Sequence, residues 1–154
     1  MKLAGDLIIA APRQAVFDAL RDARLFASCV DGVRDLQEID ASHYRAVMET
    51  KVAYIKFRFD VAVEVTKVEP PQTIEAKVEG TPHGIVGRLS ATSSTTLTEQ
   101  DGATRVQYAI EAALTGKLGS LGQPVIRSKA KEMERHFVEK LGAAFAARAV
   151  EAPR

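Results

Sequence analysis

The residues of this sequence best suited to metal binding or nucleophilic catalysis are three histidines and one cysteine. His43, His83 and His136 are widely separated, and none has a second histidine or cysteine at the spacing that zinc or iron ligands require. Cys29 has no cationic neighbour in the sequence that would stabilise a thiolate, so we interpret it as a small buried apolar side chain. The sequence therefore predicts a protein without a metal, a catalytic residue or a cofactor.

Two polar side chains remain as candidates for a binding site. His83 lies between two strand segments, and it is either an acid or base at the mouth of a pocket or an exposed loop histidine. Because the sequence shows no partner that would orient it, we favour the exposed loop. Tyr108 lies on the apolar face of a predicted strand, so its hydroxyl needs a partner if it is buried. That partner is either a ligand carbonyl or the backbone or water.

The overall charge and composition exclude several classes of protein. Lys and Arg number 21 against 20 for Asp and Glu, a net charge of +1, which leaves no electrostatic footprint for nucleic acid. The start of the chain has an acidic residue at Asp6 and lacks the apolar core of a signal peptide. No apolar run approaches the roughly 18 residues that would span a bilayer. We therefore expect a soluble cytoplasmic protein, at most peripheral to the inner face of the cell membrane.

The elements that would position the candidate residues are mainly strands. Between Ile55 and Val65 apolar residues alternate with charged ones, which is typical of an antiparallel sheet with one buried face. Similar alternation, with a turn signal at Gln100–Gly102, predicts further strands. Besides Ile55–Val65, the predicted strands, which include a short one near the N-terminus, are Leu3–Ala10, Tyr44–Val52, Ile74–Val78, Arg88–Glu99 and Thr104–Ala112.

The last third of the chain changes to helical spacing. Apolar residues recur every three or four positions and predict an amphipathic helix to about Ala149: Val125, Ile126, Ala130, Met133, Phe137, Leu141, Ala144 and Phe145. Either the helix begins near Pro124, or a first turn at Leu118–Leu121 is kinked by it, and we favour the kink. Two short helices are expected earlier, from Pro12 to Arg21 and after Asp22.

The fold class predicted by these elements is α+β. No long crossover helix separates successive strands, so a parallel sheet is excluded. The long helix needs an apolar surface to pack against, and the inner face of the sheet is the one available. We therefore predict a helix-grip fold, in which a curved antiparallel sheet wraps around the C-terminal helix. We expect a single domain over residues 1–149, with a short tail at 150–154.

Small residues on one strand indicate that the grip is incomplete. Ala91, Ser93 and Thr95 are the inward positions of their strand, opposite the helix, where a close-packed core would use larger side chains. Small and hydroxylated residues there would leave a pocket with apolar walls and a few polar groups. The alternative is that large helix residues such as Met133 and Phe137 fill the space. The pattern favours neither interpretation over the other.

Three segments of the chain resemble one known family. The entry segment Ala11–Asp22, followed by Cys29–Val33, resembles that of the START-like (SRPBCC) superfamily, which has this order of elements. The glycine-spaced segment Gly116–Gln123, with Phe137 further along the helix, is similar to the CoxG family of carbon monoxide dehydrogenase subunits. Two residues depart from the family pattern, because Asp31 replaces a common proline and Pro124 interrupts the helix.

The resemblance implies a non-catalytic accessory protein of molybdenum-containing carbon monoxide dehydrogenase-type enzymes. Such a protein recruits the enzyme to the membrane or carries a hydrophobic molecule such as a lipid or quinone between sheet and helix. The residues expected to line that pocket are Met48, Phe57, Phe59, Leu89, Tyr108, Met133 and Phe137. The alternatives are a cyclase or dehydratase, which would need two inward ionisable groups, and a closed-core protein–protein adaptor. The basic helix surface around Lys129 and Lys131 is either a contact for anionic lipid or an acidic partner, or an ordinary solvated helix face, and we favour the solvated face.

Overall fold

The structure is a computed structural model that describes residues 1–151, with side chains described to residue 147. The elements are, in order, β1 (Lys2–Ile9), α1 (Arg13–Arg21), α2 (Ala23–Cys29), β2 (Val33–Glu38), β3 (His43–Val52), β4 (Ile55–Glu69), β5 (Thr73–Pro82), β6 (Gly87–Gln100), β7 (Ala103–Thr115), α3 (Gly116–Gly119) and α4 (Gln123–Glu151). The tail expected at 150–154 falls largely outside the described residues. No described helix is long and apolar enough to cross a bilayer.

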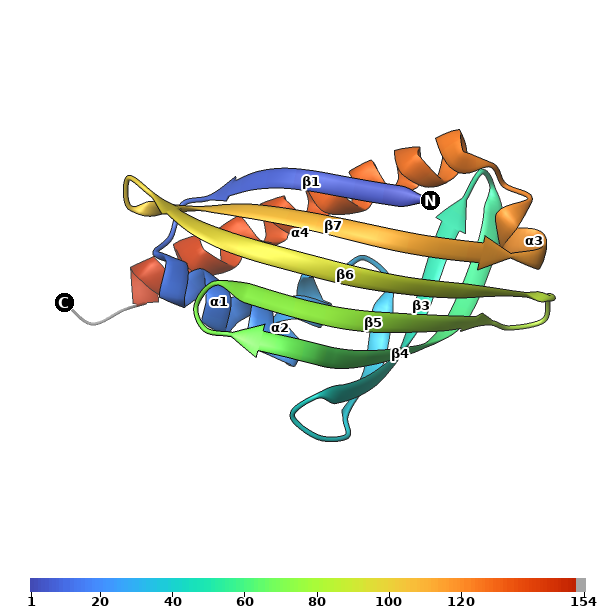
Figure 1. The fold of residues 1–154 in the computed structure, drawn as a ribbon, viewed down its shortest axis with the longest axis horizontal. Helices are drawn as coiled ribbons and strands as arrows, with labels where there is room; N and C mark the ends of the chain where they lie inside the picture. The colour runs from blue at the N-terminus through green and yellow to red at the C-terminus, as the bar shows by residue number, and fades with distance from the viewer. Residues whose placement is uncertain (152–154) are drawn as a thin grey trace.

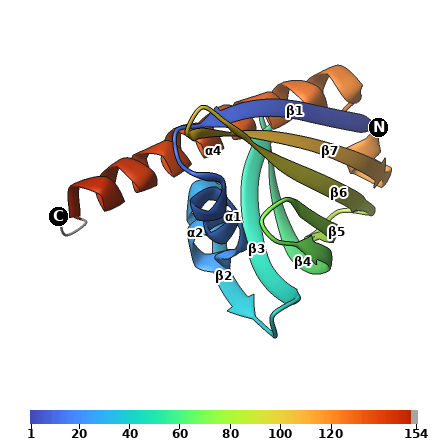
Figure 2. The same cartoon turned by 60° about the vertical axis from the view of Figure 1, so that its left-hand side comes forward.

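The seven strands form one antiparallel sheet in the order β1-β7-β6-β5-β4-β3-β2. Each strand from β2 to β7 pairs with its neighbour in the chain, and β1 closes the sheet against β7. The sheet curves around α4, while α1 and α2 lie beside the C-terminal part of that helix (Figures 1 and 2). This arrangement confirms the predicted α+β helix-grip fold.

Two hairpin turns of the sheet have the same backbone shape but different residues. Between β6 and β7, Asp101 and Gly102 have φ of 51° and 80°, as the Asp-Gly signal predicts. Between β3 and β4, Ala53 and Tyr54 have φ of 50° and 69°. Neither is a residue that adopts this left-handed conformation readily, so the β3–β4 turn carries local strain.

The helix that the sheet grips starts later than we expected. The segment before it forms a separate short helix, α3, and Gly122 with φ of 89° turns the chain into α4 at Gln123. Pro124 therefore lies in the first turn of α4, where its missing N–H costs nothing, and it kinks no helix. The favoured prediction of one kinked helix was wrong, because a positive-φ glycine breaks the helix before the proline is reached.

The described apolar core is divided between the two ends of the sheet. The helical-end core, where α1, α2 and α4 meet, contains buried residues from all these elements and from three strands: Ile9, Ala11, Val16, Phe17, Ala19, Cys29, Leu97, Val106 and Leu141. The α3-end core is smaller and contains Phe57, Phe59 and Leu118. The middle of the sheet belongs to neither.

Candidate functional site

The middle of the inner sheet face is made of small side chains. Ala91, Ser93 and Thr95 all face inward, as predicted. Strand register places them in line with inward residues of β5 and β7, which include Ala76, Val78, Ile110 and Ala112. Ala112 is buried, whereas the other six are only half-buried. Solvent therefore reaches side chains that a filled core would cover.

The side chains of α4 that pack against the buried core, Phe137 and Leu141 among them, do so at the helical end of the sheet. The closest backbone neighbours of α4 are α2, β1 and β3, which lie beside the middle strands. On the β1 side, Arg127 Nη1 donates a hydrogen bond to the carbonyl oxygen of Lys2 at 2.7 Å. Met133, on the helix face toward the sheet, is also only half-buried. We call the partly exposed inner face of the middle strands, together with the side of α4 toward it, the central gap, and it is the candidate binding site.

The seven residues predicted to line a pocket do not lie together. Met48, Phe57, Phe59 and Leu89 gather in or against the α3-end core, where the two phenylalanines are 3% and 8% exposed. Phe137 packs against the helical-end core, with its ring 5.1 Å from that of Phe26. Tyr108 and Met133 are half-buried at the central gap. The first four residues thus lie at the α3 end of the sheet and Phe137 at the helical end, which leaves Tyr108 and Met133 as candidates for the face between them.

Tyr108 lies flat across β1. Gly5 is its cross-strand partner, and a Cβ added at Gly5 would come within 2.2–2.6 Å of the ring edge and hydroxyl. Glu134 of α4 lies beside the phenol and is itself half-buried. Burial raises the pKa of Tyr108 to about 12, and the negative charge of Glu134 and a hydrogen bond from the phenol to that carboxylate add to the shift. The phenol therefore keeps its proton at all physiological pH values and can donate a hydrogen bond.

Glu134 is the functional candidate that the sequence missed. Helical periodicity does not separate it from the charges of the outer helix surface, but the structure places its carboxylate beside Tyr108. Its position next to Met133 and three residues before Phe137 places it at the border of the apolar stripe. That border position was the available signal.

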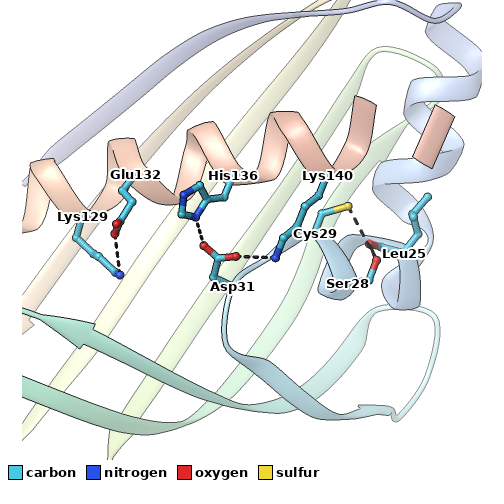
Figure 3. A network of polar contacts seen from close by, with 8 residues as sticks. All are labelled: Leu25, Ser28, Cys29, Asp31, Lys129, Glu132, His136 and Lys140. Atoms are coloured by element: carbon cyan, nitrogen blue, oxygen red, sulfur yellow. Dashed lines mark hydrogen bonds and ion pairs between the residues drawn. The ribbon is translucent and has the colours of Figure 1, made fainter. Parts of the chain in front are cut away.

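A polar cluster fastens the other side of α4 to the loop before β2 (Figure 3). The Asp31 carboxylate accepts a hydrogen bond from Lys140 Nζ at 2.6 Å and another from His136 Nδ1. The bonds from Lys140 and then His136 lower the pKa of Asp31 below its ordinary value of 3.8. Asp31 thus joins the loop before β2 to α4.

The Asp31 cluster predicts a pH-dependent contribution to stability. Because the folded-state pKa of Asp31 is lowered, the contribution is full above about pH 4 and is lost as the pH falls through the folded pKa. Asp31→Asn should lower the free energy of unfolding at pH 7 by about 1 kcal/mol, since the cluster is partly exposed. Urea unfolding at pH 7 and pH 3 measures this. A deficit as large at pH 3 as at pH 7 would contradict the ion-pair account.

The remaining polar candidates lie away from the central gap. His83 is exposed, as we favoured, but its Nε2 contacts Asp60 Oδ2 at 2.8 Å, so the expectation that no partner orients it was wrong. Cys29 is 2% exposed in the helical-end core, as the apolar interpretation predicts. Neither residue faces the gap with Tyr108.

A model of the CoxG family of carbon monoxide dehydrogenase subunits matches residues 5–146. The chain belongs to this family. No curated protein matches the sequence. The glycines of the family-like segment have a structural reason in this member, because Gly116 and Gly119 allow close backbone contacts and Gly122 takes a positive φ of 89°. A Cβ at Gly116 would lie 2.3 Å from the Val86 carbonyl oxygen, and one at Gly119 would lie 2.7 Å from that of Leu114.

Solved structures share the fold over nearly the whole chain. A conserved protein from Geobacillus kaustophilus is 25% identical, with 96% of this chain and 97% of that chain covered and a TM-score of 0.88. Protein Ms6760 from Mycobacterium smegmatis is 19% identical, with coverage of 95% and 91% and a TM-score of 0.70. Ara h 8.0201 is 12% identical, with coverage of 96% and 98% and a TM-score of 0.65. These similarities support the helix-grip fold.

Proposed function

We propose that this CoxG-family protein is a non-catalytic carrier that binds a hydrophobic small molecule, lipid- or quinone-like, in the central gap. The observation that supports this is the row of small, solvent-reached side chains on the inner sheet face, with a closed apolar core at each end. Such a space has apolar walls and few polar groups, as ligand sites do. Each CH₂ group of a ligand moved there from water contributes about 0.8 kcal/mol, before ordering costs.

The partner we propose is a molybdenum-containing dehydrogenase of the carbon monoxide dehydrogenase type. Family membership supports an accessory role beside such an enzyme. The ionisable groups at the central gap are Tyr108 and Glu134, and the raised pKa of Tyr108 keeps it from acting as a base near neutral pH. Tyr108 and Glu134 still supply the two inward ionisable groups that the cyclase or dehydratase alternative needs, so it is family membership that favours carriage.

Native mass spectrometry of the protein purified from its own host tests the carrier function. We expect a bound apolar molecule that is released when the protein is denatured. The neutral fluorophore N-phenyl-1-naphthylamine provides a second test, because its emission rises on transfer to an apolar site. A clean unliganded mass, together with no fluorophore uptake, would rule out the carrier.

Contact with a lipid surface is the second function we propose, and the β3–β4 hairpin supports it. Tyr54 at its tip is 94% exposed, and the neighbouring Ile55 is 37% exposed. Lys51 and Lys56 face each other directly across the hairpin, and neither has an acidic partner in the described part of the chain. Like charges in register are unfavourable in water, whereas an apolar tip flanked by lysines suits an anionic membrane surface.

Tyr54→Ser should weaken binding to mixed phosphatidylglycerol–phosphatidylcholine vesicles about tenfold, since one inserted aromatic side chain is lost. Vesicle co-sedimentation measures this at low and high salt. The matched control is Ile39→Ser, which removes a 55% exposed apolar side chain after β2. Binding that is equal in both variants and the unaltered protein would contradict membrane contact by the hairpin.

A further inference from the structure

Three segments meet at the α3 end of the molecule: the β3–β4 hairpin, the β5–β6 loop and α3 (Figure 1). Val52 of the hairpin, Ile85 of the loop and Leu121 after α3 all pack against the α3-end core. The backbone N–H of Lys117 donates a hydrogen bond to the Val86 carbonyl oxygen at 3.0 Å, which joins α3 to the loop. We call the surface that they form the α3-end face, and it comprises residues 51–57, 81–88 and 115–121.

The formal charges of the α3-end face are all positive. None of its residues is Asp or Glu, whereas four are lysine or arginine: Lys51, Lys56, Arg88 and Lys117. The turns at the opposite ends of the same long strands, 69–72 and 99–102, contain three acidic residues and no lysine or arginine. The strands therefore run from an acidic end to a basic end, and the basic end is complementary to an anionic surface.

A groove of about 520 Å³ opens on this face between the β5–β6 loop and the start of α3, and it is lined by Thr81, Val86, Gly87, Arg88, Thr115 and Gly116. The two exposed threonines can donate hydrogen bonds, and Arg88 contributes a positive charge. Glu79 lies 3.3 Å from Arg88 Nε, but an exposed pair of this kind is weak, so the guanidinium can turn to another anion. Hydroxyl donors beside an arginine suit a phosphate group.

We propose that this groove binds the head-group phosphate of an anionic phospholipid, with Val86 entering the bilayer as a second insertion point besides Tyr54. Val86 lines the groove and is 86% exposed, so a lipid held there has an apolar side chain beside its acyl chains. The lysines of the same face attract neighbouring anionic head groups. This inference rests on the proposed lipid contact of the β3–β4 hairpin and adds a phosphate site to it.

Co-sedimentation with phosphatidylglycerol–phosphatidylcholine vesicles and with pure phosphatidylcholine vesicles tests the inference. Arg88→Gln should weaken binding to the mixed vesicles about fivefold at low salt, since one charge at the lipid surface is lost. Its binding to phosphatidylcholine should be almost unchanged, because the choline cation offsets that phosphate. Val86→Ser should weaken binding about fivefold at low and high salt alike, because the lost contact is apolar. Combining Val86→Ser with Tyr54→Ser should multiply the two effects.

Two matched variants lie away from the α3-end face. Arg45→Gln removes an exposed charge near the other end of β3, and Val68→Ser removes a 37% exposed apolar side chain near the other end of β4. Both should bind as the unaltered protein does. If Tyr54→Ser weakens binding whereas Arg88→Gln and Val86→Ser do not, the phosphate site is overturned and the hairpin contact stands. Absence of vesicle binding by the unaltered protein would overturn both, and inorganic phosphate bound by it but not by Arg88→Gln would then assign the groove to a soluble phosphate.

Discussion

Replacing Ser93 by phenylalanine is expected to abolish uptake of apolar molecules while the protein remains folded. Ser93 lies inward at the middle of β6, in register with Ala76 and Ile110. A phenylalanine there would occupy the central gap that the small side chains leave open. We expect affinity for N-phenyl-1-naphthylamine to fall at least tenfold. The melting temperature should hold or rise, since burying an aromatic ring contributes up to about 3 kcal/mol.

The matched control for this change is the next residue of the same strand. Ser94 is exposed on the outer face, so Ser94→Phe adds the same side chain away from the gap. Its effect on fluorophore binding should be negligible. Unaltered binding in Ser93→Phe would place the ligand elsewhere. A sharp fall in its melting temperature would instead mean that the inner face is already filled.

The second large effect is expected at Gly116, where the backbones of β7 and the β5–β6 loop touch. Gly116 has φ of 62°, and an added Cβ would lie 2.3 Å from the Val86 oxygen and 2.7 Å from the Gly87 Cα. Gly116→Ala combines the left-handed backbone penalty with overpacking, and we expect it to lower the free energy of unfolding by about 2–4 kcal/mol. Chemical denaturation measures the loss.

Two other glycines separate the causes of that loss. Gly102 has φ of 80° but open space around it, so Gly102→Ala incurs only the backbone penalty. Gly142 lies inside α4 with open space, and Gly142→Ala should stabilise the helix by up to about 1 kcal/mol. If Gly116→Ala lowers the free energy of unfolding no more than Gly102→Ala does, the close contact with Val86 makes no contribution to the loss.

Much of the fold could be predicted because its signals are local. Alternation in Ile55–Val65, the Asp-Gly turn and the helical stripe from Val125 each depend on neighbours a few residues apart. The inward orientation of Ala91, Ser93 and Thr95 was predicted from the same alternation of side chains between the two faces of a strand. The start of α4 was missed because the sequence does not reveal the positive φ of Gly122, which breaks the chain before Pro124 can act.

The arrangement of the site was harder to predict because it depends on distances along long strands. β4 contains 15 residues, so side chains on one face can be about 45 Å apart, and a shared face does not make a shared pocket. Phe59 and Phe137 were grouped on that basis but lie in separate cores. Glu134 was missed because periodicity gives the helix face only to within a residue or so. Its neighbour Tyr108 comes from another element entirely.

The pairing of β1 with β7 sets the order in which the chain can fold. Residue 2 pairs with residue 111, so the first strand has no partner until the last strand has been synthesised. The strands from β2 to β7 can zip together as successive hairpins during that time, whereas α1 and α2 must wait beside an unfinished sheet. Pairing β1 with β7 joins residues far apart in the sequence, and contacts of that kind form slowly. Until β1 pairs, β7 is an edge strand with unpaired backbone groups. We therefore expect the pairing of β1 with β7, rather than formation of the hairpins, to be the final folding step.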